Sequence, residues 1–250
     1  MAQDLDALAG QLLQAAAAAG ADAADVVVGE GSGLSMEIRH GKLEQAERAE
    51  GIDLGLRVFL GQRQASVSVS DASPATITEM AERAVFMARE APEDPYAGLA
   101  APEQLATDWD IAALDLEDAS PEPSPEALAE RAAQAEAAAL SVEGVAQVDS
   151  AGAGYGKTRM HMATSNGFSA GYARTSHSTS CVAISGEGLS MERDYCGEGR
   201  IHAEDMPDAP SIGTLAGERA VARAGASKPP TGAYPVVFDE RVSSSLVGHV

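Results

Sequence analysis

Residues 34–50 read Leu-Ser-Met-Glu-Ile-Arg-His-Gly-Lys-Leu-Glu-Gln-Ala-Glu-Arg-Ala-Glu. The first seven alternate apolar and polar residues, which is the pattern of a strand with one buried face. His40-Gly41-Lys42 follows as a turn, so we predict a hairpin between strands 34–40 and 43–50. A short strand at 26–28 precedes the hairpin. The glycine-rich residues 29–33 are interpreted as a plain turn, because no helix opens behind them to form a phosphate loop.

More strands and two helices surround this hairpin. Residues 52–60 and 65–69 alternate again and predict two further strands. Residues 3–20 have the leucine spacing of an amphipathic helix, which Gly20 ends. Ser73-Pro74 begins a second helix, with the serine as N-cap. The order of one helix, five strands and one helix predicts an α+β fold, in which helices pack on one side of a mostly antiparallel sheet.

A proline-rich, acidic stretch at 91–125 divides the chain. Such a composition is typical of a solvated linker or a surface connection, and Trp109 is expected to fix it to one domain. We therefore predict an N-terminal α/β domain at 1–90 and a strand-rich second α+β domain at 126–250, truncated at its C-terminal end. A protease is expected to cut first within the linker.

The second domain is predicted to begin with a helix from Ser124-Pro125 to about Leu140. Residues 145–202 are rich in strand-forming residues, and a further helix is expected at 210–225. Turns are expected at three glycine-containing stretches. The strongest hairpin signal among them is Asn166-Gly167. The three stretches are 152–154, 165–167 and 185–188.

The last stretch, 234–250, predicts a strand followed by a helix. Val236-Val237-Phe238 is a short apolar run of the kind found in buried strands, and Asp239 is suited to cap the next helix. Val242, Leu246 and Val250 recur at four-residue spacing and predict an apolar helix face. The pattern has no C-cap, which leads us to expect a fragment of a longer protein.

Composition limits the classes of function. Acidic residues number 38 against 17 basic ones, for a net charge of −21, and such a surface repels phosphate backbones. Direct nucleic-acid binding is therefore not expected. The sequence shows no signal peptide and no apolar run long enough to span a membrane, so the expected location is the cytoplasm. Cys181 and Cys196 match no metal motif and are expected to be reduced thiols.

Three groups of residues resemble functional motifs. Residues 152–158, Gly-Ala-Gly-Tyr-Gly-Lys-Thr, are similar to a phosphate-binding loop, but position 151 is alanine and a strand-like stretch follows, so we interpret them as a β-turn. Ser176, Ser178 and Ser180 lack the surroundings of a nucleophile elbow. None of the histidines has a second ligand at helical spacing, although three of them could converge in space. The five are His40, His161, His177, His202 and His249.

Several stretches together resemble one family. These stretches are 25–28, the hairpin 36–45, Gly55-Leu-Arg-Val-Phe59, Thr164-Ser-Asn-Gly167 and the tail at 234–250. Their order and spacing are similar to the N-terminal portion of the TldD/PmbA (TldE) family. That family is known as a heterodimeric zinc metallopeptidase and was once described as a modulator of DNA gyrase.

The sequence of the tail, residues 234–250, distinguishes the two subunit types of that family. The TldD type carries His-Glu-x-x-x-His on the helix after the strand, whereas this chain has Gly248-His249 at the aligned place. Glycine offers no ligand atom, and one histidine cannot build a three-ligand zinc site. The resemblance therefore implies the zinc-free PmbA/TldE type, with no catalytic, cofactor or metal residue in this chain.

By this resemblance the expected function is that of a partner to a zinc-bearing TldD-type subunit. The substrates would be unfolded or extended peptides, as in peptide-antibiotic maturation and antitoxin degradation. The alternative from another class is a stand-alone peptide-binding or regulatory protein without peptidase activity.

Overall fold

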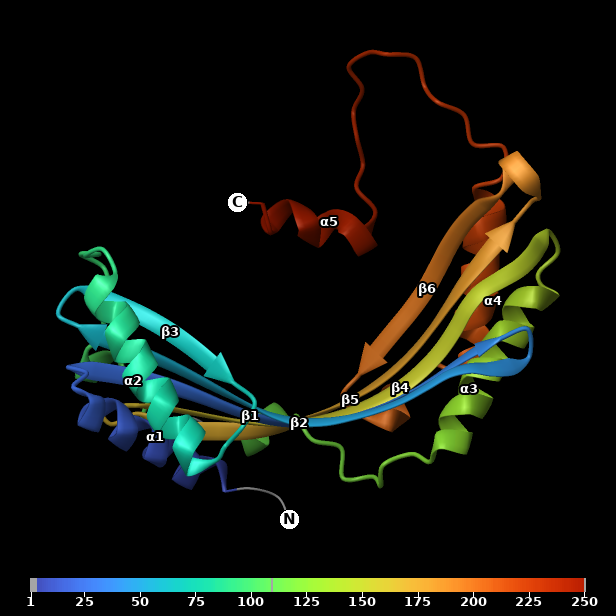
Figure 1. The fold of residues 1–250 in the computed structure, drawn as a ribbon. Helices are drawn as coiled ribbons and strands as arrows, with labels where there is room; N and C mark the ends of the chain where they lie inside the picture. Colours follow the sequence, from blue (N-terminus) through green and yellow to red (C-terminus); the bar gives the residue numbers. More distant parts are fainter. Residues whose placement is uncertain (1–3, 109, 250) are drawn as a thin grey trace.

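The computed structural model describes residues 4–108 and 110–249. Its centre is a six-stranded antiparallel sheet with the strand order β3-β2-β1-β4-β5-β6. Four strands are 17 to 20 residues long, and the sheet bends across its middle so that both ends rise toward the same side (Figure 1). The strands are β1 (Ala23–Arg39), β2 (Lys42–Leu60), β3 (Arg63–Val69), β4 (Val145–Thr164), β5 (Ser169–Ser185) and β6 (Glu192–Arg200).

Five α-helices among the described residues accompany the sheet, and each falls where the sequence predicts a helix. α1 and α2 cover one end of the sheet, and α3 and α4 cover the other, all on its convex side (Figure 1). The predicted caps are confirmed, since Gly20 is left-handed and the Ser73 and Ser124 side chains accept N–H bonds of the first helical turn. The helices are α1 (Leu5–Ala19), α2 (Pro74–Glu90), α3 (Pro125–Ser141), α4 (Ala209–Ala222) and α5 (Glu240–Val247).

Each helix pair encloses its own apolar core. Leu12 of α1 and Met80 of α2 pack with Leu54 and Leu56 of β2, and all four are almost fully buried. Burial of side chains of this size contributes about 1.5–3 kcal/mol each. Under α3 and α4 the core is built largely from alanines and the two cysteines. Small side chains let these helices approach each other and the sheet closely. The α+β fold with helices on one face of an antiparallel sheet is confirmed.

The predicted hairpin is present but much longer than expected. His40 and Gly41 both have positive φ, as the tight turn between β1 and β2 requires. The predicted turn at 29–33 is wrong, because these residues continue β1 and pair with both β2 and β4. The predicted turn at 152–154 is wrong for the same reason, since β4 runs through it. The predicted turns at 165–167 and 185–188 are confirmed.

The glycines of these strands explain the wrong predictions. On the face not covered by helices, Gly33 of β1 lies opposite Gly156 of β4, and Gly154 lies opposite Ser178 of β5. Glycine is usually a breaker within a strand, but the neighbouring strands on both sides satisfy the backbone here. The sheet is therefore continuous from end to end. The domain limits at 1–90 and 126–250 remain a prediction.

The tail departs from the sequence prediction. Val236, Val237 and Phe238 form no strand and are exposed, because no described strand lies beside them to complete a ladder. Asp239 does cap α5, and its side chain accepts the Arg241 N–H at 3.0 Å. The apolar face of α5 is not buried, and the helix ends at Val247 with Gly248 as its C-cap. Val250, Trp109 and the first residue of the predicted helix 3–20 lie outside the described residues.

Candidate functional site

The linker lies over the middle of the convex side, between the two helix pairs, instead of hanging free (Figure 1). Thr175 of β5 holds it in two ways. The Thr175 N–H donates to the Leu116 carbonyl at 3.0 Å, and the Asp118 N–H donates to the Thr175 hydroxyl at 2.8 Å. That hydroxyl also donates to the Ile201 carbonyl at 3.0 Å, and Thr175 is fully buried. We name residues 115–118 the clasp, since they join the linker to the sheet.

Asp118 is the central charge of the clasp. Its carboxylate accepts the backbone N–H groups of Ala203 at 2.7 Å and Ser120 at 2.8 Å. These hydrogen bonds, with a smaller contribution from His177, hold the pKa of Asp118 well below its ordinary value. These contacts favour the charged form of the carboxylate.

His177 faces the same carboxylate from β5. Its side chain is 10% exposed, and its Nε2 lies 3.1 Å from Asp118 Oδ2. The two groups are at ion-pair distance, but their angle does not make a hydrogen bond, and Nε2 has no aligned partner among the described residues. The imidazole also packs edge-on against Tyr155, with ring centroids 5.2 Å apart. His177 is thus a buried histidine whose Nε2 faces a carboxylate without forming an aligned hydrogen bond.

Of the three histidines that the sequence allowed to converge, the structure places two at the clasp and the third elsewhere. His202 joins His177 at the clasp, where its Nε2 lies 3.1 Å from the Asp115 carbonyl oxygen. That hydrogen bond raises the pKa of His202. His161 is elsewhere, 3.1 Å from Asp6 of the N-terminal segment. Within residues 4–108 and 110–249, no three metal-binding side chains gather in one place.

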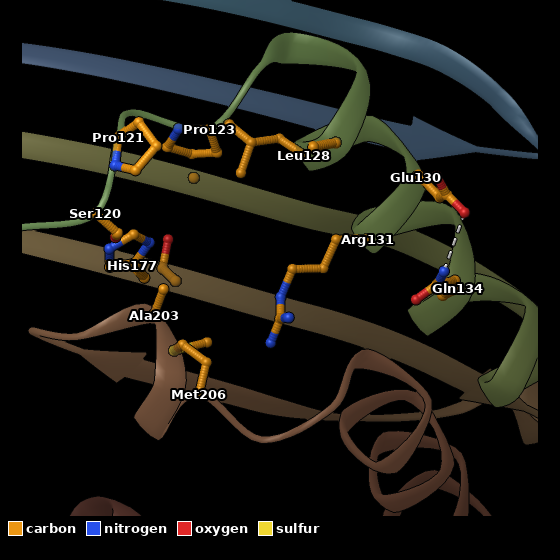
Figure 2. Close-up of a pocket in the computed structure, with 13 residues that line it drawn as sticks. Ser120, Pro121, Pro123, Leu128, Glu130, Arg131, Gln134, His177, Ala203 and Met206 are labelled. Carbon is orange, nitrogen blue, oxygen red and sulfur yellow. Dashed lines mark hydrogen bonds between the residues drawn. The ribbon is translucent and has the colours of Figure 1, made fainter.

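A pocket of about 430 Å³ opens beside the clasp. Its walls come from the linker, from α3, from His177 and from the short 3-10 helix Ala203–Asp205 with the Met206 that follows it (Figure 2). Pro121, Pro123 and Leu128 make one side of it apolar. This pocket brings a charged side chain together with a buried histidine.

Arg131 of α3 supplies the positive charge of this pocket. Its Nε donates to the Thr179 hydroxyl at 2.6 Å, and its Nη2 donates to the Pro207 carbonyl. No carboxylate of the described residues lies within ion-pair distance of it. Burial lowers the pKa of Arg131, and the only opposing influence is the more distant charge of Asp208. The guanidinium is therefore held in place by neutral acceptors and lacks a counter-ion.

The sequence analysis missed Arg131 and the clasp. One signal for Arg131 was present, because it falls on the same helix face as Leu128, Ala132 and Ala135, all of which are buried. A cation on the apolar face of a helix is unusual without a partner. The contacts of Thr175 and Asp118 join residues 57 apart and left no local pattern to detect.

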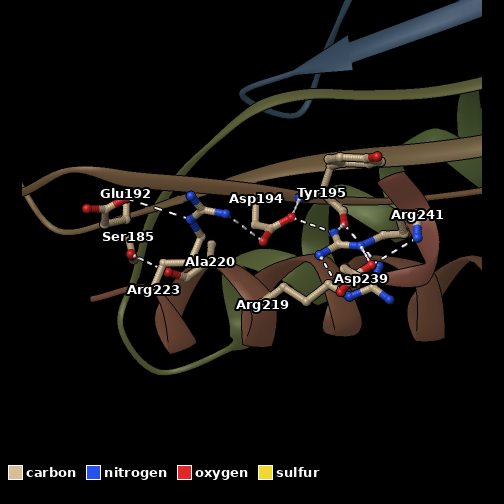
Figure 3. A network of polar contacts seen from close by, with 9 residues as sticks. All are labelled: Ser185, Glu192, Asp194, Tyr195, Arg219, Ala220, Arg223, Asp239 and Arg241. Carbon is tan, nitrogen blue, oxygen red and sulfur yellow. Dashed lines mark hydrogen bonds and ion pairs between the residues drawn. The ribbon is translucent and has the colours of Figure 1, made fainter. Parts of the chain in front are cut away.

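A second polar network fastens the tail to the far edge of the sheet (Figure 3). The Asp194 side chain of β6 is 8% exposed, and it pairs with Arg241 of α5 at 2.7 Å and with Arg223, the C-cap of α4, at 3.4 Å. Burial alone would raise the pKa of Asp194, but the hydrogen bonds from Arg241 and the Tyr195 N–H outweigh it and lower the pKa. The same Arg241 lies over the Tyr195 ring at 5.3 Å. This network is structural, because its charges are matched.

The other candidate residues take structural roles. Ser176, Ser178 and Ser180 project from the uncovered face of β5 as an exposed row. The residues similar to a phosphate-binding loop lie within β4, so no helix N-terminus is there to receive a phosphate. Cys181 and Cys196 lie directly opposite each other on β5 and β6, and both are buried free thiols.

We expect both cysteines to be inert in the native protein. Burial raises the pKa of Cys181 to about 12 and also raises that of Cys196. Only the thiolate is nucleophilic, and with a pKa of about 12 about one Cys181 in 10⁴ would be a thiolate at pH 8. An aromatic disulfide reagent should label neither thiol before unfolding and both after it. Rapid labelling of the folded protein would contradict this arrangement.

No helix among the described residues is long and apolar enough to cross a membrane. Two family models match the chain. The first domain of the PmbA/TldA metallopeptidases matches residues 24–88, and their central domain matches residues 118–227. Together the two models span more than half of the chain.

Two named relatives match along nearly all of the chain. The metalloprotease PmbA of Escherichia coli O157:H7 is 33% identical over 92% of this chain and 50% of its own length. The metalloprotease PmbA homolog of Haemophilus influenzae is 31% identical over 95% of this chain and 52% of its own length. The chain therefore spans about half the length of the relatives it matches.

Solved structures share the fold. A Bacteroides thetaiotaomicron protein, described as a candidate modulator of DNA gyrase, has 25% identity and a TM-score of 0.85 over 99% of this chain and 56% of its own. TldE from Thermococcus kodakarensis has 17% identity and a TM-score of 0.68 over 86% of this chain and 47% of its own. Since the resemblance seen in the sequence, the family models and the named relatives agree, the chain belongs to the PmbA/TldD metallopeptidase family and is of the PmbA (TldE) type.

Proposed function

We propose that the full-length protein is the zinc-free partner of a TldD-type metallopeptidase subunit. The feature that supports this most directly is Gly248 at the end of α5, which by the resemblance seen in the sequence stands where the TldD type has a zinc histidine. A glycine cannot coordinate metal, and no carboxylate of the described residues lies within ion-pair distance of His249 to activate water. In the proposed complex the partner supplies the zinc and the water activation.

The substrates that we propose are unfolded or extended peptides. Two features of the sheet support a role in holding or enclosing them. β3 covers only residues 54–60 of β2, so the other half of β2 is an open sheet edge. An extended peptide can add to such an edge through its backbone alone, which needs no particular side chain. The uncovered concave face of the sheet, with its exposed row of serines, would form one wall of the enclosure (Figure 1).

The test is reconstitution of activity with the full-length protein and its TldD-type partner. The mixture should hydrolyse an unstructured peptide, and a chelator should abolish the hydrolysis. Full-length protein alone should be inactive with or without added zinc, and metal analysis should find far less than one zinc per chain. One tightly bound zinc per chain, or chelator-sensitive hydrolysis by this protein alone, would refute the zinc-free assignment.

The partner's contribution can be separated from this chain's. A TldD-type subunit whose catalytic glutamate is replaced should bind this protein but leave the mixture inactive. Co-elution of the two full-length proteins in gel filtration reports assembly independently of hydrolysis. Failure to co-elute at micromolar concentration would favour the alternative of a stand-alone peptide-binding protein.

A further inference from the structure

We propose that the pocket between the clasp and α3 binds the C-terminal carboxylate of a peptide whose last side chain is apolar. The inference rests on the proposed handling of peptides, and it concerns a site on the convex side of the sheet. Four features of the pocket carry it: the free donors of Arg131, the buried His177 whose Nε2 makes no aligned hydrogen bond, the apolar wall and the size of the cavity.

The first feature is the unused half of the Arg131 guanidinium. A guanidinium has five N–H donors, and two of them are engaged by Thr179 and Pro207. The remaining three, on Nη1 and Nη2, have no acceptor among the residues that the structure describes. Adjacent N–H groups of this kind bind a carboxylate through two parallel hydrogen bonds. The two existing contacts hold the side chain in position, so little conformational entropy is lost when a ligand binds.

The second feature is His177. Its side chain is nine-tenths buried, it lines the same pocket, and its Nε2 has no aligned hydrogen-bond partner. A buried polar atom without a partner costs free energy, which a ligand group or a bridging water would recover. The Asp118 carboxylate faces this same Nε2 at 3.1 Å, close enough for an ion pair but without an aligned hydrogen bond. Figure 2 shows His177 and Arg131 on the border of one cavity, separated by open space.

The apolar wall and the volume of the pocket determine which kind of anion fits it. Pro121, Pro123, Leu128 and Met206 line the cavity with apolar surface, which suits an apolar side chain next to the charged group. A bare inorganic anion would leave this surface unused. A volume of about 430 Å³ suits one or two residues of a peptide. Glu130 stands at the rim, where its carboxylate accepts a hydrogen bond from Gln134, and would repel a second negative charge.

The experiment compares two short peptides on the isolated chain by calorimetry and by NMR. Acetyl-Gly-Gly-Leu with a free carboxylate should bind, and the same peptide as its C-terminal amide should bind about tenfold to a hundredfold more weakly, because one charge-assisted pair is lost. Arg131→Gln should weaken the free acid to the level of the amide. The matched control is Arg83→Gln on α2, an exposed arginine at the other end of the sheet, which should bind like the parent.

A second variant tests the pocket independently, in case Arg131→Gln does not fold. Ala203 is exposed at the pocket wall, so Ala203→Phe should fill the cavity and weaken binding while the thermal unfolding curve stays unchanged. Equal affinity for acid and amide, or unchanged binding by Ala203→Phe, would overturn the proposal. Displacement of the peptide by inorganic phosphate at lower concentration than by acetate would also overturn it, in favour of a phosphate site. None of these measurements involves the zinc subunit, so their failure is distinguishable from failure of the proposed function.

Discussion

Replacing Gly213 with alanine should lower the free energy of unfolding by about 3 kcal/mol, the upper part of the range for overpacked cores. Gly213 lies in α4 where that helix crosses α3. A Cβ at this position would stand 2.0 Å from the carbonyl oxygen of Ala135 and 2.8 Å from its carbonyl carbon. Both are backbone atoms of a regular helix, so no side-chain rotation can relieve the overlap. The two helices would have to separate.

The neighbouring turn of α4 is equally close. A Cβ at Gly217 would lie 2.9 Å from the Val142 side chain and 3.1 Å from the Ala139 carbonyl oxygen. Gly213 and Gly217 are four residues apart and face α3 together. The alanine-rich sequence of both helices thus has a specific consequence, which is that their backbones come close enough to exclude even a methyl group.

Urea denaturation followed by circular dichroism measures the effect. The matched control is Gly10→Ala in α1, where a new Cβ meets no atom within 4 Å. Alanine is the better helix former by about 0.5–1 kcal/mol, so this variant should be more stable than the parent. If Gly213→Ala unfolds at the same urea concentration as the parent, the close crossing of α3 and α4 is wrong.

Local signals in the sequence predicted the helices and failed on the long strands. Ser73, Ser124 and Gly20 act through contacts within three or four residues, so their roles are legible from the sequence alone. Gly31 and Gly51 look like breaks in a strand when considered locally. They lie opposite each other in the ladder, and their strand conformation depends on the pairing of β1 with two neighbours. Such pairing is a tertiary property.

The candidate site was harder still to predict. Its members come from the linker, α3, β5 and the segment after β6, and only the folded chain brings them together. In the tail, the sequence predicted a strand that does not form. Val236–Phe238 has the local pattern of a buried strand, but no partner strand lies beside it among the described residues. An apolar pattern shows only that a segment is suited to a strand. Whether the strand forms depends on a neighbouring strand with which it can pair.

Replacing Thr175 with valine should release the clasp and lower the free energy of unfolding by about 2 kcal/mol. Valine matches threonine in shape but has no hydroxyl. The Asp118 N–H loses its acceptor and the Ile201 carbonyl loses a donor, and a buried group left unpaired costs about 1–3 kcal/mol. Part of this cost is avoided if the linker detaches and its backbone turns to water. We therefore expect a mobile linker in addition to a less stable sheet.

Limited proteolysis with mass spectrometry distinguishes the two effects. In the parent, the first cuts should fall in residues 91–114, and the clasp at 115–118 should be protected. In Thr175→Val, cuts at 115–124 should become among the first. Ser176→Ala is the matched control, since Ser176 is the next residue along β5 but is exposed on the opposite face. Loss of stability without new cuts near the clasp would mean that Thr175 supports the sheet alone. The pocket at Arg131 would then owe none of its shape to the linker contact.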